Sequence, residues 1–187
     1  MTTELPFELE TDLEKQIAAD PKWREGIDWG KPRTGHLEGP VKYHIAEVLA
    51  NIDRQCPNEE ERRALRLVAL IHDAFKYRVD ESRPKIGSNH HAHIARKFAE
   101  RYIHDPVLLD LIELHDEAYN SWRLGANRNK WHHAEERLNN LLQRIGPGLP
   151  LYARFFHADS ETDSKDPAPI AWFEQFLKNK GLTFPFC

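Results

Sequence analysis

The sequence has few of the features that mark secreted or membrane proteins. It contains only two cysteines, Cys56 and Cys187, among 187 residues, too few for a disulfide framework and too far apart for a metal knuckle. No apolar run approaches the roughly 18 residues of a membrane span. The N-terminal segment is acidic where a secretory signal would be basic and then apolar. We therefore expect a cytoplasmic protein without membrane association.

An excess of basic residues is also lacking. The formal net charge is −4, so no overall positive field attracts nucleic acid or anionic lipid, although a local basic groove is compatible with this value. We do not expect a nucleic-acid partner. The chain is 40% hydrophobic and 30% charged, which is typical of a globular protein of one domain. A homo-oligomer is left open.

Alternating strand patterns, internal repeats and linkers of proline and glycine are absent, and helical periodicity dominates. Asn58 and Asp105 have the character of N-caps, the latter before a proline at the first helical position. We predict an all-α single-domain bundle of about six or seven helices, and the expected ranges are 41–52, 59–71, 90–102, 106–114, 131–145, 151–159 and 166–180.

The remaining segments are predicted to be irregular. We expect an N-terminal arm over residues 1–32, followed by one helical domain over residues 33–187, with its core at 33–165. Polar loops are expected at 78–88 and 123–130. This division places most polar residues of interest within the helical domain.

Histidine is abundant, with eleven residues, and several of them lie where a solvent-facing residue is not expected. His44 stands among the apolar positions of its helix, and two His-Asp pairs, 72–73 and 115–116, end apolar stripes. Asp159 follows a run of buried-type residues, and histidines 90, 91 and 93 open another helix. A buried imidazole or carboxylate needs a partner. Several of them on different helices can satisfy one another by sharing a metal ion.

The pairing of adjacent residues sets a geometric condition. Neighbouring residues in a helix diverge by about 100°. His72 and Asp73 therefore reach one ion only from a helix end or with side chains of unlike length. The alternative interpretation is a cluster of polar groups that satisfy one another in the core.

The sequence resembles the HD-domain metal-dependent phosphohydrolases. Their ordered pattern of a histidine, a His-Asp pair and a distant aspartate matches His44, His72, Asp73 and Asp159. LVALIHDAFK is similar to the family's apolar helix ending in H-D-x-x-K, with Lys76 at the motif lysine. HLEGPVKYHIAEVL resembles the opening of the HD module in some tRNA nucleotidyltransferases, and FFHADSETD resembles the closing aspartate helix. The resemblance spans about residues 33–165 and implies an HD-type fold.

The resemblance implies a ligand set. His44, His72, Asp73 and Asp159 are the implied ligands of one ion. Many HD proteins bind a second ion through two further histidines, which here are His115 and either His90 or His91, with His91 preferred. If both extra histidines are ligands, Asp73 bridges two ions; otherwise the site holds one. A site rich in histidine suits Mn, Fe, Co, Ni or Zn.

The implied activity is hydrolysis of a phosphate ester, in which the metal activates water and Asp73 and Lys76 take part in catalysis. The expected substrate is a small phosphorylated molecule such as a nucleotide or phosphodiester. The expected substrate contacts are Lys76, Arg78, Arg123 and His36, with Trp122 as a further candidate. Two alternatives remain, namely an HD-fold di-iron oxygenase and a regulatory module that binds a nucleotide without turnover.

Overall fold

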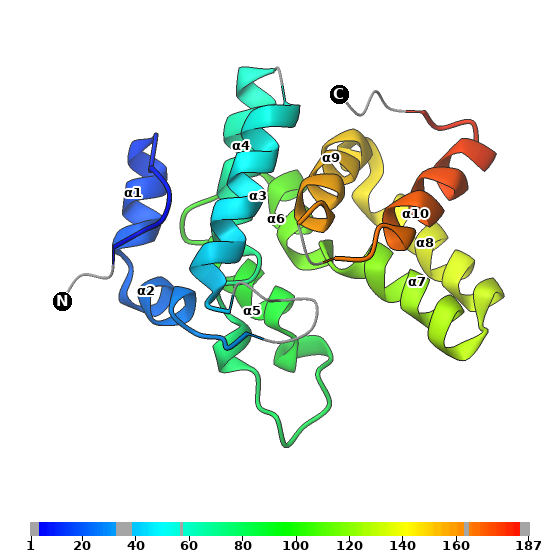
Figure 1. Cartoon of the computed structure of the whole chain (residues 1–187), viewed down its shortest axis with the longest axis horizontal. Coiled ribbons are helices and arrows are strands. Elements are labelled where there is room, and N and C mark those ends of the chain that lie inside the picture. Colours follow the sequence, from blue (N-terminus) through cyan, green and yellow to red (C-terminus); the bar gives the residue numbers. More distant parts are fainter. Residues whose placement is uncertain (1–3, 33–38, 57, 163–164, 184–187) are drawn as a thin grey trace.

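The computed structural model describes residues 4–32, 39–56, 58–162 and 165–183, and their regular elements are all helices (Figure 1). The all-α prediction is confirmed for this part of the chain. The helices are α1 (Asp12–Ala19), α2 (Pro21–Ile27), α3 (Val41–Gln55), α4 (Glu59–Ile71), α5 (His91–Ala99), α6 (Pro106–Leu114), α7 (Glu117–Arg128), α8 (Trp131–Ile145), α9 (Leu149–Ser160) and α10 (Ala168–Asn179), with short 3-10 helices η1 (Lys76–Arg78), η2 (Gly87–Asn89) and η3 (Gly146–Gly148).

The predicted N-caps begin their helices as expected. The side chain of Asn58 accepts a hydrogen bond from the backbone N–H of Glu61 at 3.0 Å, and Asp105 accepts one from Val107 at 2.8 Å. Each bond satisfies an N–H group that has no partner within the helix. The residues of α8 agree with the predicted range 131–145.

Two predictions of irregular structure were wrong, and the predicted number of helices was therefore too low. The N-terminal arm contains α1 and α2, whose Ile17, Trp23 and Ile27 are fully buried. Most of the predicted loop 123–130 belongs to α7, which ends at Arg128 and is capped by Asn129 in the left-handed conformation (φ 51°). In both places the apolar stripe is short, so packing against the rest of the protein stabilises the helix more than the local pattern does.

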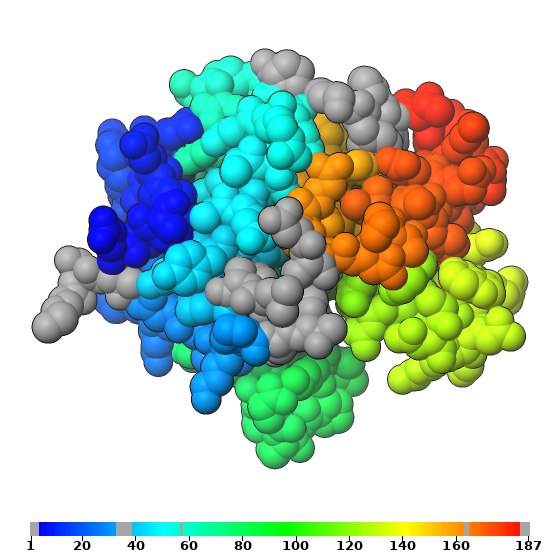
Figure 2. Space-filling model, in the orientation of Figure 1, coloured from blue at the N-terminus to red at the C-terminus, as the bar shows by residue number. Residues whose placement is uncertain are grey.

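The helices are arranged around a centre formed by α3, α4 and α9. α3 packs against both α4 and α9, α4 contacts α6, and α7 packs along α8 and against α10. Figure 1 shows α1 and α2 at one end of the long axis and α7, α8 and α10 at the other. The space-filling view shows the same division on the surface (Figure 2). The histidine-bearing ends of α4 and α6 lie between these two groups.

The helix α2 supports the end of α4 and the chain just after it. The buried indole of Trp23 donates a hydrogen bond to the carbonyl oxygen of Leu70 at 2.7 Å. Gly26 lies so close that an added Cβ would stand 1.7 Å from the carbonyl oxygen of Ala74. The segment that the sequence suggested was an irregular arm therefore packs against the turn that carries His72 and Asp73.

Candidate metal centre

His44 and Asp159 meet because α3 packs against α9. Both residues are buried, and Nε2 of His44 lies 2.9 Å from Oδ1 of Asp159. The amide of Asn51 on α3 donates to the carbonyl oxygens of Ala158 and Glu161, each at 2.9 Å. These two bonds hold the end of α9 against α3 and so fix the position of Asp159.

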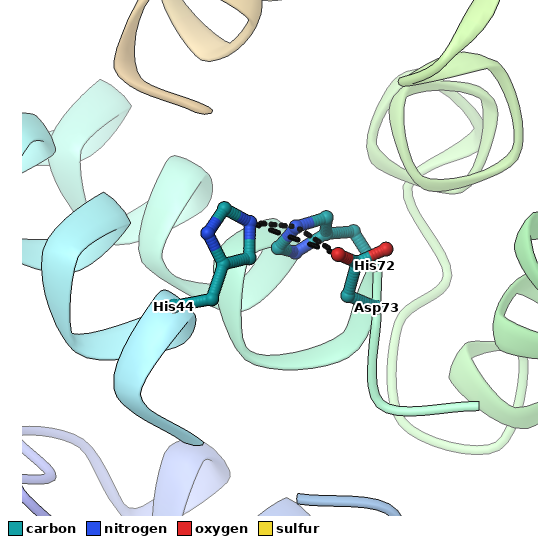
Figure 3. Close-up of side chains that lie close together, drawn as sticks. All are labelled: His44, His72 and Asp73. Carbon is teal, nitrogen blue, oxygen red and sulfur yellow. Dashed lines mark hydrogen bonds and ion pairs between the residues drawn. The ribbon is translucent and has the colours of Figure 1, made fainter. Parts of the chain in front are cut away.

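His72 and Asp73 lie just beyond the last residue of α4, where the backbone leaves the helix (Figure 3). Nδ1 of His72 lies 2.8 Å from the carbonyl oxygen of Ala69. Because a carbonyl can only accept, Nδ1 donates this hydrogen bond, and Nε2 is the ring nitrogen that faces the site. Nε2 lies 3.3 Å from Nε2 of His44 and 3.6 Å from Oδ2 of Asp73. The helix-end condition set by the sequence is met.

The spacing of these four groups matches the edges of a coordination polyhedron. Nε2 of His44 is 3.7 Å from Oδ2 of Asp73, and Nε2 of His72 is 3.6 Å from Oδ1 of Asp159. Around an ion with bonds of about 2.1 Å, neighbouring ligand atoms stand about 3.0 Å apart in an octahedron and about 3.4 Å apart in a tetrahedron. The observed separations cluster around these values, so the donor atoms leave space for one cation between them.

A second group lies beside the first. His115 follows the last residue of α6, and its Nδ1 lies 2.8 Å from the carbonyl oxygen of Ile112, as in the His72 turn. Nε2 of His91 lies 3.3 Å from Nε2 of His115. Oδ1 of Asp73 is 3.4 Å from the His91 nitrogen and 3.5 Å from the His115 nitrogen. Asp116 faces the same nitrogens, at 3.2 Å from His91 and 3.5 Å from His115.

The structure assigns different contacts to the two histidines of the doublet. His90 is the N-cap of α5, and its Nδ1 accepts a hydrogen bond from the backbone N–H of Ala92 at 3.3 Å. His91 is the member that reaches Asp73 and His115. His90, His91 and Asp116 also lie close enough together to form a third candidate group. Of the two histidines, His91 is the one placed to share an ion with Asp73 and His115.

Asp73 is the residue common to both groups. Its Oδ2 faces His44 and His72, and its Oδ1 faces His91 and His115. The side chain is 5% exposed, and the contacts of Oδ1 with His91 and His115 are too long or too bent to be good hydrogen bonds. A buried carboxylate oxygen without a good hydrogen bond is costly, and a cation would satisfy it. His44, His72, Asp73, His91 and His115 therefore form a buried cluster that can bind a metal.

Electrostatics keep the carboxylates charged. Burial raises the pKa of Asp73, but the charges of Lys76 and His72 outweigh it and hold that pKa well below the usual range. Burial also acts to raise the pKa of Asp116, but the charges of His115 and His91 outweigh burial and lower that pKa. Without a metal, negative charge in this cluster is balanced by lysines and protonated imidazoles.

The histidines respond in opposite directions. Burial and the charge of Lys165 lower the pKa of His44 to about 4, against the opposing effect of Asp159. Burial alone lowers the pKa of His115, but Asp116 and Asp73 outweigh it and raise the pKa to about 9. The pKa of His91 is raised for the same reason. In the metal-free protein at neutral pH, His44 is therefore neutral and His115 is protonated.

A cavity of about 430 Å³ opens onto this cluster. The carboxylates of Asp73, Asp116 and Asp159 and the imidazole of His115 form part of its wall. The other lining residues come from η1, from α7, and from the segment that leads from α9 into α10, and they are Lys76, Tyr119, Trp122, Arg123, Asn127, Ser160, Lys165, Asp166 and Pro169. A small molecule in this cavity would contact the cluster directly.

The predicted substrate contacts fall into three groups. Lys76 and Arg123 line the cavity, and so does Trp122, whose ring stacks on Tyr119 with centroids 6.1 Å apart. Arg78 is exposed and is not among the lining residues. His36 lies outside the described residues.

Sequence reasoning missed two residues of the site. The pair His115-Asp116 repeats the pattern of His72-Asp73 at the end of an apolar helix, but the sequence analysis gave Asp116 no role in the site. Lys165 gave no such signal, since it is a lysine in a polar segment. Its Nζ lies 3.1 Å from Oδ1 of Asp159.

Comparisons with protein-family models, with curated proteins and with solved structures found no match. The inference about function therefore depends on the site itself. Within the described ranges, none of the helices has the length and apolar character needed to cross a membrane.

Proposed function

We propose that the protein is a metal-dependent phosphohydrolase with two metal ions bridged by Asp73. The observation that carries the proposal is the placement of the two Asp73 oxygens between separate histidine pairs at a cavity wall. His44 and His72 lie on one side, and His91 and His115 on the other. A carboxylate held this way is suited to a pair of ions that act on one phosphate group.

The order of these residues along the chain supports an HD-type fold. The four implied ligands of the first ion come from α3, from the turn after α4, and from α9, which is the order of the HD pattern. His91 and His115 lie between the His-Asp pair and the last aspartate. We infer membership of the HD superfamily from this order together with the resemblance of the sequence.

The set of donors indicates the kind of metal. Imidazole nitrogens with carboxylate oxygens suit Mn, Fe, Co, Ni or Zn better than Mg or Ca. A bound ion of this kind polarises a phosphoryl oxygen and lowers the pKa of a bound water from 15.7 towards 7.

The chain supplies the remaining requirements for binding a phosphate ester. Lys76, Arg123 and Lys165 bring positive charge to the cavity, and such groups stabilise charge on a phosphate in the transition state. Asp116 lies beside His91 and His115 on the cavity wall, and positive charge of a bound metal would keep its carboxylate ionised. Its carboxylate can therefore accept a hydrogen bond from a water molecule and orient it.

The size and lining of the cavity favour a small substrate. A volume of about 430 Å³ lies in the lower part of the range for sites that bind small molecules. Trp122 and Tyr119 form an aromatic surface on α7 that can contact the organic part of the ester. We propose a small phosphorylated molecule, for which a nucleotide is one candidate, in the cytoplasm.

Turnover by the purified protein tests this proposal. Tag-free protein is stripped of metal, reconstituted separately with Mn, Fe, Co, Ni and Zn, and assayed for phosphate release from mononucleotides and for cleavage of small phosphodiesters. We expect turnover with at least one metal, and a fall of at least 100-fold in His72→Ala. His132→Ala is the matched control because this histidine is exposed, pairs with Glu136 and does not line the cavity.

The outcomes separate the alternatives. Absence of turnover with every metal and both ester types, in a protein that binds metal, contradicts the proposal. A redox-active di-iron centre without ester hydrolysis supports the oxygenase. Tight binding of a nucleotide without hydrolysis supports the regulatory module.

A further inference from the structure

Lys165 places a positive charge on a proposed metal ligand. It lies in the segment between α9 and α10, and its Nζ donates a hydrogen bond to the carbonyl oxygen of Asp159 at 2.6 Å. The same Nζ lies 3.1 Å from Oδ1 of Asp159. This oxygen is also the one that lies 2.9 Å from Nε2 of His44. The ammonium group thus occupies the neighbourhood in which a metal bound to His44 and Asp159 would lie.

Two cations at this position repel each other. The Lys165 ammonium already pairs with Asp159, the carboxylate that would also bind the metal. A divalent ion carries twice the charge of a proton, and Coulomb repulsion grows with the product of the charges. Lys165 must therefore either weaken metal binding or move away when the metal binds.

The surroundings allow the ammonium to move. The Lys165 side chain is 21% exposed and lines the cavity that also receives Lys76 and Arg123. Its backbone N–H donates to the carbonyl oxygen of Thr162 at 3.0 Å, so the main chain can stay in place. The four-carbon stem of a lysine is flexible and can carry the charge from Asp159 into the cavity.

We propose that Lys165 is an exchangeable internal cation that pairs with Asp159 in the metal-free protein and binds the anionic group of the ligand once metal is present. Metal displaces the ammonium from Asp159, and the released charge then adds to the positive charge that faces the ligand. Metal loading and anion binding are thereby coupled, and the coupling acts equally in both directions. This inference rests on the metal centre of the proposed function and adds a binding residue to it.

The test uses Lys165→Met, which keeps the length of the stem and removes the charge. Binding of Mn²⁺ to the full-length metal-free protein and binding of inorganic phosphate to the Mn²⁺-loaded protein are measured by calorimetry at fixed ionic strength. We expect Lys165→Met to bind Mn²⁺ about tenfold more tightly and phosphate about tenfold more weakly, within the usual range of coupling between sites. Opposite shifts are diagnostic, because general damage to the site would weaken both.

Lys85→Met is the matched control for loss of one positive charge. Lys85 is exposed, pairs with Glu81 and lies away from the lining of the cavity. We expect both affinities to stay within twofold of wild type. Thermal unfolding provides a second readout: metal-free Lys165→Met should melt at a lower temperature than wild type, because Asp159 loses its counter-ion, and Mn²⁺ should remove that difference.

The results decide between clear outcomes. Unchanged or weaker Mn²⁺ binding in Lys165→Met overturns the exchange, as does unchanged phosphate binding. A wild-type protein that binds no metal overturns it together with the metal centre. If both shifts occur but no phosphate ester is hydrolysed, the exchange is supported and only the proposed activity fails.

Discussion

Trp23→Phe should destabilise the protein and loosen the metal centre, although Trp23 touches none of the proposed ligands. Its buried indole donates a hydrogen bond to the carbonyl oxygen of Leu70, two residues before His72. Phenylalanine removes that donor and leaves the carbonyl without this partner in the core, which costs about 1–3 kcal/mol. The smaller ring leaves a cavity that adds about 1 kcal/mol. We expect a loss of about 2–4 kcal/mol in the free energy of unfolding.

Urea unfolding of the metal-free protein, followed by circular dichroism, measures this loss. Trp131→Phe is the matched control because Trp131 is 39% exposed, and its loss should stay below about 1 kcal/mol. The same two variants are then titrated with Mn²⁺. We expect weaker binding only in Trp23→Phe, since the turn that carries His72 and Asp73 loses its support. Equal stability of the two variants, or unchanged Mn²⁺ affinity in Trp23→Phe, would refute the reasoning.

Four further predictions concern the site and the helix that supports it. The pKa of His115, about 9, lies above its ordinary value near 6.5, so a proton competes with metal at neutral pH. Mn²⁺ affinity should therefore rise by at least about fivefold per pH unit between pH 6.5 and 8.5. Mn²⁺ affinity that calorimetry finds independent of pH would argue against this. For the same reason the metal-free protein should lose stability, seen as a lower urea midpoint, as pH rises through 9. Gly26→Ala should lower the melting temperature by several degrees because its Cβ meets the Ala74 carbonyl. Gly87→Ala, whose Cβ meets nothing nearby, should lower it less. Equal shifts in melting temperature would count against close packing of α2. Trp122→Ala should raise KM for an aromatic phosphate ester with little change for a small aliphatic one, and an equal rise for both would remove the aromatic surface from the account.

Much of the fold could be predicted where the local signals were strong. Capping residues such as Asn58 and Asp105 and the long apolar stripe of α8 set helix boundaries close to the observed ones. The helices α1, α2 and α7 could not be predicted in this way. They are short or weakly patterned, and contacts made far along the chain stabilise them, such as that between Trp23 and Leu70.

The candidate site shows the same limit. The sequence singled out His44, His72, Asp73 and Asp159 as polar residues among apolar stripes, and the structure brings the four side chains together. It could not show that Asp73 directs one oxygen to each histidine pair, since this depends on how α4, α5 and α6 meet. Lys165 belongs to the site only through the path of the chain after α9, for which no local pattern exists.

The number of metal ions bound by the wild-type protein and by Asp73→Ala tests the central claim most directly. Elemental analysis of tag-free protein reconstituted with Mn, Fe, Co, Ni or Zn is compared with the same measurement on His44→Ala and His115→Ala, each checked for folding by circular dichroism. The account predicts about two equivalents in wild type, about one in each histidine variant, and close to none in Asp73→Ala, because both ions share that carboxylate. Wild-type protein that takes up no metal, or Asp73→Ala that still holds two equivalents, would contradict it.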